Sequence, residues 1–248
     1  MDLLFYFGEF EHMHFRISGL IPPQPAPPPE YSDTDKVTII LLDENKERTE
    51  TIQQYSADYV NPLTSASQYL QSNSSSFYDV VIGERFMDGA SGGATNIIQN
   101  GGFKNCANIV NAEIYCTSTG YDTTYVDGLG DDFFRGCTAL ENVILPSSLR
   151  KINNAVFRGC TSLDSIEIPG QVESIGGAAF ADASIVAITI PSSVAEINDT
   201  AFVRCFNITS MTINKPLNSI TGAPWTKDFN TPYPYAYNPE TLPITWNG

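Results

Sequence analysis

A period of about 23 residues runs through the second half of the sequence, and no other feature constrains the fold as strongly. Aromatic residues recur at spacings of 23, 23, 22 and 23; they are Phe134, Phe157, Phe180, Phe202 and Trp225. Two apolar pairs recur between them: Val143/Leu145, Ile166/Ile168, Ile188/Ile190 and Met211/Ile213, then Leu149/Ile152, Val172/Ile175, Val194/Ile197 and Leu217/Ile220. A unit this short cannot bury its own apolar side chains, so the copies must stack and share one core.

The spacing inside each copy predicts its local structure. Apolar residues at alternate positions indicate a strand with one inward face, and a proline follows the strand in three of four copies, where it ends the ladder because it has no N–H. Degenerate copies at Val80/Ile82 and Ile244/Trp246 bring the expected strands to about seven. The outward side chains should form a flat, mostly small and neutral strip, here called the outward strip: Asn111/Glu113, Asn142/Ile144, Ser165/Glu167, Ala187/Thr189 and Ser210/Thr212.

The pattern LxxIxIPxxVxxIxxxAFxxC resembles the BspA-like (Treponema-type) leucine-rich repeat family. Leu140–Phe157 and Leu163–Phe180 match it almost position by position, and the likeness covers roughly residues 78–248. It implies a repeat solenoid: a right-handed leucine-rich-repeat coil with a parallel β-sheet on the concave face and short helical or irregular return limbs. It also implies adhesion to, or recognition of, a protein or cell-surface glycan, at an extracellular, cell-surface or virion location.

The chain before the repeats is organised differently. Residues 1–35 form a predicted extended arm, because six prolines lie among the eight residues from Pro22 to Pro29. Residues 36–77 predict a small cap, in which Lys36–Leu42 and Glu47–Ile52 form a β-hairpin around the DENK turn and a polar, partly helical stretch follows. The solenoid of residues 78–248 contains insertions near 87–95, 116–123 and 226–240.

The arm leaves two interpretations open. It is either a semi-rigid spacer or a segment that a scaffold protein orders, and the second supports an alternative function as a structural component of a larger assembly such as a phage particle. No secretory signal is recognisable, because Asp2 replaces the basic start of a signal peptide and Glu9 and Glu11 interrupt the apolar run.

Composition excludes several functions. The net charge of −15 argues against nucleic acid as a partner, and no apolar run is long enough to span a membrane. The two histidines, His12 and His14, both lie in the arm, so a catalytic triad or a histidine-based metal site in the folded body is not expected. The sequence therefore predicts a protein that is not an enzyme and needs no cofactor or metal.

Cysteines and acidic residues were the remaining candidates for chemistry. Four cysteines, Cys106, Cys137, Cys160 and Cys205, lie three residues after a repeat aromatic, where another copy has Ala183; this interchange predicts small buried packing positions. Cys116 lies in an insertion and is the candidate reactive thiol. The acidic residues Asp122, Asp127, Asp131 and Asp132 indicate a solvated loop or, as the alternative, a weak calcium site.

Tyrosines in the insertions are the main candidate binding residues. Tyr233, Tyr235 and Tyr237 alternate in a proline-stiffened segment, and Tyr121 and Tyr125 lie in the earlier insertion. Tyrosine gives a rigid contact area with a polar tip, as recognition surfaces use; the alternative is that these loops only cover the ends of the coil. Glu113 and Glu167 are the acidic candidates on the outward strip.

Overall fold

The structure is a computed structural model in which residues 36–56, 62–83, 97–98, 100–115, 126–216, 219–220 and 244–247 are described. The arm of residues 1–35, Cys116, Trp225 and the five candidate tyrosines lie outside the described residues. The described chain contains thirteen strands and one helix, and none of its helices is long and apolar enough to cross a membrane.

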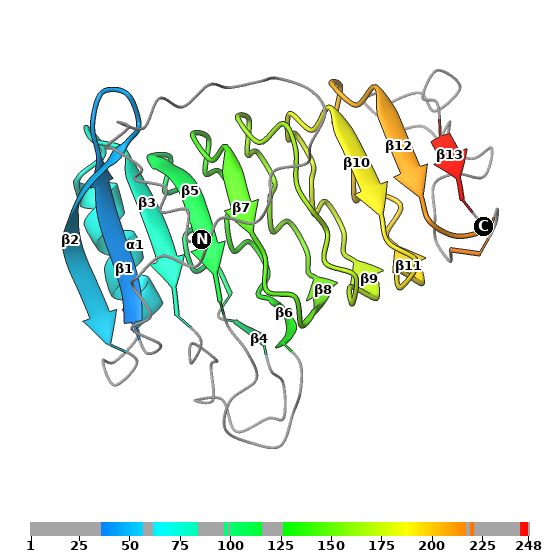
Figure 1. The fold of residues 1–248 in the computed structure, drawn as a ribbon, viewed down its shortest axis with the longest axis horizontal. Coiled ribbons are helices and arrows are strands. Elements are labelled where there is room, and N and C mark those ends of the chain that lie inside the picture. Colours follow the sequence, from blue (N-terminus) through cyan, green and yellow to red (C-terminus); the bar gives the residue numbers. More distant parts are fainter. Residues whose placement is uncertain are drawn as a thin grey trace, which may run out of the picture. The chain divides into compact units, whose positions relative to one another are not determined.

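Strands from the repeat copies run parallel (Figure 1) and pair in two groups. One group is β3 (Tyr78–Ile82), β5 (Ile109–Ile114) and β7 (Asn142–Ile144), and the other is β10 (Ala187–Ile190), β12 (Ser210–Ile213) and β13 (Ile244–Trp246). Their registers pair the predicted inward positions with one another, for example Val80 with Ala112 and Ala112 with Val143. The alignment of the repeats therefore predicts which residues of neighbouring strands pair.

One predicted strand is not formed. Residues 164–168 contain Ile166 and Ile168 at strand spacing, yet they form no ladder, so the prediction of a strand here is wrong. The copy remains stacked because Leu163 and Ile168 are buried in the core, and because the Val186 N–H donates to the Asp164 carbonyl at 2.8 Å. Side-chain burial and one backbone bond at the first residue of the segment hold it in the stack without a strand ladder.

The return limbs also differ from the expectation of helical or irregular chain. They contain short strands that form a second parallel sheet in the order β11-β9-β8-β6-β4. These strands are β4 (Ile97–Ile98), β6 (Val126–Leu129), β8 (Leu149–Ile152), β9 (Ser174–Ile175) and β11 (Glu196–Ile197). Copies of nearly equal length bring their return limbs into the same register, so the backbones pair; the inward residues Leu149, Ile152 and Ile175 are buried against the shared core.

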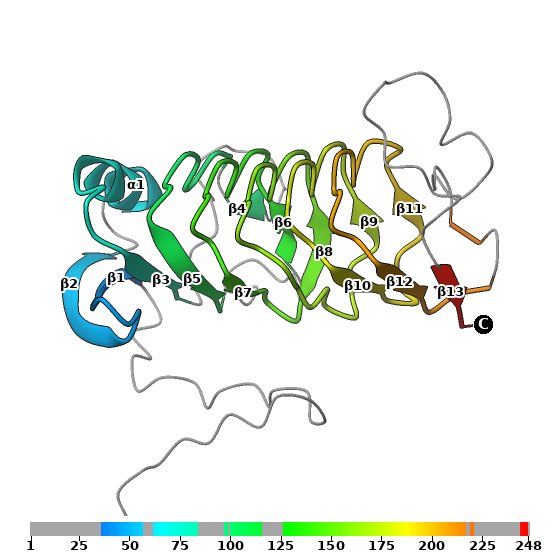
Figure 2. The ribbon, with the colours of Figure 1, turned by 90° about the horizontal axis from the view of Figure 1, so that it is seen from above.

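The predicted hairpin and helix form at the first end of the repeats. β1 (Lys36–Leu42) pairs antiparallel with β2 (Arg48–Ser56) and also with β3, which gives the sheet order β2-β1-β3-β5-β7. α1 (Pro62–Ser72) lies over one face of this sheet (Figure 2) and buries Leu63, Ala66 and Leu70. The Asn108 side chain donates to the Leu70 carbonyl at 3.0 Å and so satisfies an end group of the helix.

A ladder of aromatic rings runs through the core. Phe103, Phe134, Phe157, Phe180 and Phe202 stack in order, with centroid distances of 5.9, 5.8, 5.4 and 5.2 Å and interplanar angles between 2° and 14°. Phe133 lies edge-on to both Phe103 and Phe134. The predicted stacking of the copies is thereby confirmed, and it brings the repeat aromatics that the structure describes into contact with one another.

Backbone turns beside this ladder explain the glycines of the sequence FRGC, which occurs at residues 134–137 and 157–160. The residue two positions after each ladder aromatic has a positive φ: Asn105, Gly136, Gly159, Asp182 and Arg204. Gly136 and Gly159, both at 74°, adopt this conformation without the steric cost that a side chain adds. Asp182 and Arg204 adopt it as well, and they form a two-bond ion pair with each other across neighbouring copies.

The four repeat cysteines are buried and free. The thiols of Cys137, Cys160 and Cys205 donate to the carbonyls of Phe103, Phe134 and Phe180 at 3.1, 3.2 and 2.8 Å, so each binds the aromatic residue of an earlier copy. Burial raises the pKa of all four thiols, to about 12 for Cys160 and Cys205. These cysteines serve packing and backbone hydrogen bonding, as their interchange with Ala183 predicts.

We expect a thiol reagent to label at most one cysteine rapidly in the native protein, namely Cys116. The thiolate is the reactive form, and the buried thiols neither ionise at neutral pH nor contact solvent. The measurement is mass spectrometry after timed iodoacetamide treatment, with a urea-unfolded sample as the control in which all five react. Rapid native labelling of three or four cysteines would contradict the ladder.

Candidate functional site

The outward strip has the orientation that the sequence predicts. All ten of its residues are exposed or half-buried, whereas their inward neighbours Val143, Ile188 and Met211 are buried. Ile144 is the large apolar side chain of the strip and is 40% exposed. The strip therefore offers small, mostly uncharged side chains over most of its length.

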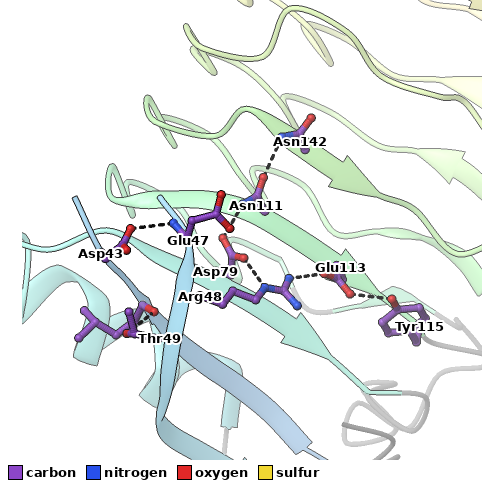
Figure 3. A network of polar contacts seen from close by, with 10 residues as sticks. Asp43, Glu47, Arg48, Thr49, Asp79, Asn111, Glu113, Tyr115 and Asn142 are labelled. Atoms are coloured by element: carbon purple, nitrogen blue, oxygen red, sulfur yellow. Dashed lines mark hydrogen bonds and ion pairs between the residues drawn. The ribbon is translucent and has the colours of Figure 1, made fainter. Parts of the chain in front are cut away.

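The hairpin adds charged residues at the first end of the strip. Its turn is fixed by Asp43, whose carboxylate accepts the backbone N–H groups of Asn45 and Glu47 at 2.8 and 2.9 Å, and whose carbonyl accepts that of Lys46. Two register shifts between β1 and β2 bend the ribbon. The turn and bend hold Arg48 beside β3 and β5 (Figure 3).

Arg48 forms the centre of a polar network on these strands (Figure 3). Its Nε donates to Asp79 Oδ2 at 2.6 Å, and its Nη2 donates to Glu113 Oε1. The Tyr115 hydroxyl donates to Glu113 Oε2 at 2.6 Å. The side chain of Arg48 is 33% exposed, that of Glu113 13% and that of Asp79 3%, so both carboxylates are largely removed from water by their cation.

The network shifts the pKa of two of its members in the direction that favours these bonds. Burial acts to lower the pKa of Arg48, but the hydrogen bonds to Asp79 and Glu113 outweigh it and raise this pKa above its usual value. Burial, followed by the hydrogen bond to Glu113, raises the pKa of Tyr115 well above that of a free tyrosine. Arg48 therefore stays charged and Tyr115 stays a hydrogen-bond donor throughout the physiological pH range.

Side-chain amides continue the network along the strip. Asp79, Asn111 and Asn142 occupy paired positions on β3, β5 and β7. Asn111 Nδ2 donates to Asp79 Oδ1 at 2.6 Å, and Asn142 Nδ2 donates to Asn111 Oδ1 at 2.8 Å. Each amide is thereby oriented by the one before it, and the row begins at the buried Asp79.

A groove of about 420 Å³ lies where the hairpin meets the strip. Its lining residues are Lys46, Glu47, Arg48, Asp79, Asn111, Ala112, Glu113, Asn142 and Ile144. The expected strip was flat and without basic residues; at this end it is hollowed and faced by two. The reason is that β1 pairs with β3, which brings the turn of a segment predicted only as a cap onto the sheet face.

The predicted site residues have different surroundings. Glu113 lies in the groove but is held by Arg48 and Tyr115, so it is not the exposed charge that the sequence predicted. Glu167 is exposed and is not among the residues that line the groove. Sequence reasoning missed Lys46, Glu47, Arg48 and Asp79. The available signal was Asp79 itself, because an aspartate inside the apolar strand YDVVI needs a partner.

Of the four acidic residues proposed as a solvated loop or weak calcium site, Asp131 and Asp132 are engaged by protein groups, and Asp122 lies outside the described residues. Burial would raise the pKa of Asp132, but ion pairs with Lys104 and Arg135 outweigh it and lower this pKa. Asp131 Oδ1 accepts two hydrogen bonds from Asn154. Among the described residues, no three histidine, cysteine or acidic side chains are grouped so that they could hold a metal ion.

Comparison with known proteins identifies the repeats. Residues 127–225 match the model of the BspA type leucine rich repeat region in six copies. Residues 127–225 of this chain are BspA-type leucine-rich repeats. The resemblance inferred from LxxIxIPxxVxxIxxxAFxxC is thereby confirmed, and the chain folds as a leucine-rich-repeat solenoid. This repeat family indicates a protein-binding or adhesion type of role.

Solved leucine-rich repeat structures are similar to parts of the chain. A leucine-rich repeat protein of T. pallidum is 25% identical over 54% of this chain and 63% of its own, with a TM-score of 0.41. One from Bacteroides ovatus is 24% identical over 73% of this chain and 42% of its own, with a TM-score of 0.44. A leucine rich cell surface protein from Faecalibacterium prausnitzii is 22% identical over 47% and 36%, with a TM-score of 0.32. The chain thus spans less than two thirds of each, and no curated protein matches it.

Proposed function

We propose that this protein is a non-enzymatic recognition or adhesion protein that binds a protein or a cell-surface glycan through its BspA-type solenoid, at the cell surface, outside the cell or on a virion. The outward strip carries the proposal. Successive copies present side chains on one face of a sheet whose other face is the core, so a ligand can contact several repeats at once. The family assignment supports the same class of role.

The candidate tyrosines are the other proposed contact residues. Tyr121, Tyr125, Tyr233, Tyr235 and Tyr237 are the large amphipathic side chains of the insertions, the type that supplies binding hot spots. Glu167 is the exposed acidic residue of the strip and is proposed as a minor contact, with Glu113 as a group that acts from inside the groove. The alternative function, a structural component anchored to a scaffold through residues 1–35, rests on the proline-rich composition of that arm.

Removing two tyrosines tests the proposal. The double variant Tyr233→Ala/Tyr235→Ala is expected to weaken binding by roughly 2 kcal/mol or more, because truncation of hot-spot aromatics typically costs that much. The measurement is binding of fluorescently labelled protein to bacterial and host cells and to a glycan array. The matched control is Glu167→Gln, expected to cost well under 1 kcal/mol as an exposed charge. If the control weakens binding and the tyrosine variant does not, the strip is the site and the tyrosines are not part of it.

A further inference from the structure

The groove between the hairpin turn and the strip has a character that the rest of the strip lacks. We propose that it binds a basic peptide segment of a protein partner, with a lysine or arginine side chain seated against Glu47. This inference rests on the proposed recognition function and names the chemistry of the partner at one place on the solenoid.

Charge is the first argument. Four carboxylates, those of Glu47, Asp79, Glu113 and Glu141, lie in or beside the groove with two cations. Both cations are already bound: Arg48 to Asp79 and Glu113, and Lys46 to Glu141. The exposed Glu47 carboxylate has no ion pair in the part of the chain that is described. Four carboxylates and two cations leave the groove net negative, and Glu47 is the carboxylate outside any ion pair of the described residues, so the groove favours a cationic side chain.

The whole chain reinforces this preference. Its net charge of −15 attracts a basic partner at long range and repels an acidic one. Because Arg48 and Lys46 already form ion pairs with carboxylates of this chain, they are poorly placed to hold a phosphate or carboxylate ligand. An anionic partner is therefore disfavoured by both the local and the overall charge.

The floor of the groove suits an extended peptide. Asn142 uses one amide hydrogen for Asn111, which leaves its carbonyl oxygen and second N–H for a ligand backbone. Ile144 lies beside it as an apolar contact for a neighbouring side chain. The next outward residues of the strip are Ser165 and Glu167, then Ala187 and Thr189; all are exposed and none is aromatic, so a peptide can continue along them. A volume of about 420 Å³ lies within the range of ligand sites, about 300–1,000 Å³.

A glycan fits less well. Sugar rings commonly stack on aromatic faces, and none of the described residues that line the groove is aromatic. Tyr115 is close to Glu113, but its hydroxyl already donates a hydrogen bond to that carboxylate. A neutral sugar would also leave the Glu47 charge without a partner.

Hexalysine labelled with fluorescein is the probe, and fluorescence anisotropy is the measurement. We expect binding to the full chain to weaken about fivefold in Glu47→Gln, because the variant removes a charge contact without changing shape. The matched control is Glu196→Gln, which removes an equally exposed carboxylate from β11 on the second sheet. We expect it to change the affinity less than twofold. Labelled hexaglutamate should not bind.

Four results would overturn the proposal. Equal weakening by both variants would show general attraction to an acidic protein, and absence of hexalysine binding would show that the groove takes no basic segment. Binding of maltohexaose that Asn142→Ala abolishes, with hexalysine binding independent of Glu47, would assign the groove to a glycan. Cell binding separates this proposal from the proposed recognition function. If the wild type and Glu47→Gln bind cells equally well, the recognition function stands and this proposal fails.

Discussion

Replacement of Phe157 by alanine is expected to lower the free energy of unfolding by about 4 kcal/mol. The ring is fully buried and stacks on Phe134 at 5.8 Å and on Phe180 at 5.4 Å. Truncation removes the transfer free energy of the ring, leaves a cavity and breaks two aromatic pairs at once. A loss of this size is a large part of the total stability of an ordinary domain, about 5–15 kcal/mol.

The chain provides a matched control in Phe206. This phenylalanine lies on the same series of turns but is 65% exposed, so Phe206→Ala should change stability by less than about 0.5 kcal/mol. Urea unfolding followed by circular dichroism measures both. Because each repeat contacts mainly its neighbours, the Phe157 variant should also broaden the transition as the array loses cooperativity. A cost below about 1.5 kcal/mol, or equal costs for the two variants, would mean that the rings do not form the central support of the core.

The phenylalanine ladder shows which contacts can be predicted from the repeat spacing. A residue type that returns at the same slot must meet its own copies when the units stack, so the neighbours of Phe157 and the burial of Cys160 follow from spacing alone. Hydrogen bonding between backbones is less well determined by spacing. Ile166 and Ile168 satisfy the strand pattern, and yet their segment forms no strand ladder; one backbone bond, from the Val186 N–H to the Asp164 carbonyl, joins it to the next copy.

The candidate site was predictable only in part. Asn111, Glu113, Asn142 and Ile144 could be placed on the outward face because they alternate with core residues. The opposite wall could not be derived from the repeats, because it depends on β1 pairing with β3 across more than thirty residues, a contact that no periodicity reports. Asp79 was the one local indication, since a carboxylate inside an apolar strand implies that a cation from elsewhere in the chain covers it.

That dependence makes Arg48 the most sensitive polar residue of the groove. Arg48→Met keeps the length and apolar stem of the side chain but removes its charge, so the carboxylates of Asp79 and Glu113 remain buried without a cation. Breaking one partner of a buried pair costs about 3–5 kcal/mol, and because Arg48 is one third exposed we expect about 3 kcal/mol. Lys46→Met is the control on the same hairpin: its pair with Glu141 is exposed on both sides and should contribute less than about 1 kcal/mol.

A double-mutant cycle separates the loss of charge compensation from other effects of the substitution. Asp79→Asn keeps the shape of the side chain and its acceptor for Asn111, and it removes the buried charge. If Arg48 stabilises the fold by neutralising Asp79, then Arg48→Met should cost distinctly less in the Asp79→Asn background than in the wild type, with a coupling of at least about 1 kcal/mol. Equal costs in both backgrounds would show that Arg48 stabilises the hairpin through packing or through Glu113 alone. In that case the buried aspartate would not be what holds the hairpin turn over the sheet, and the wall of the groove would have another cause.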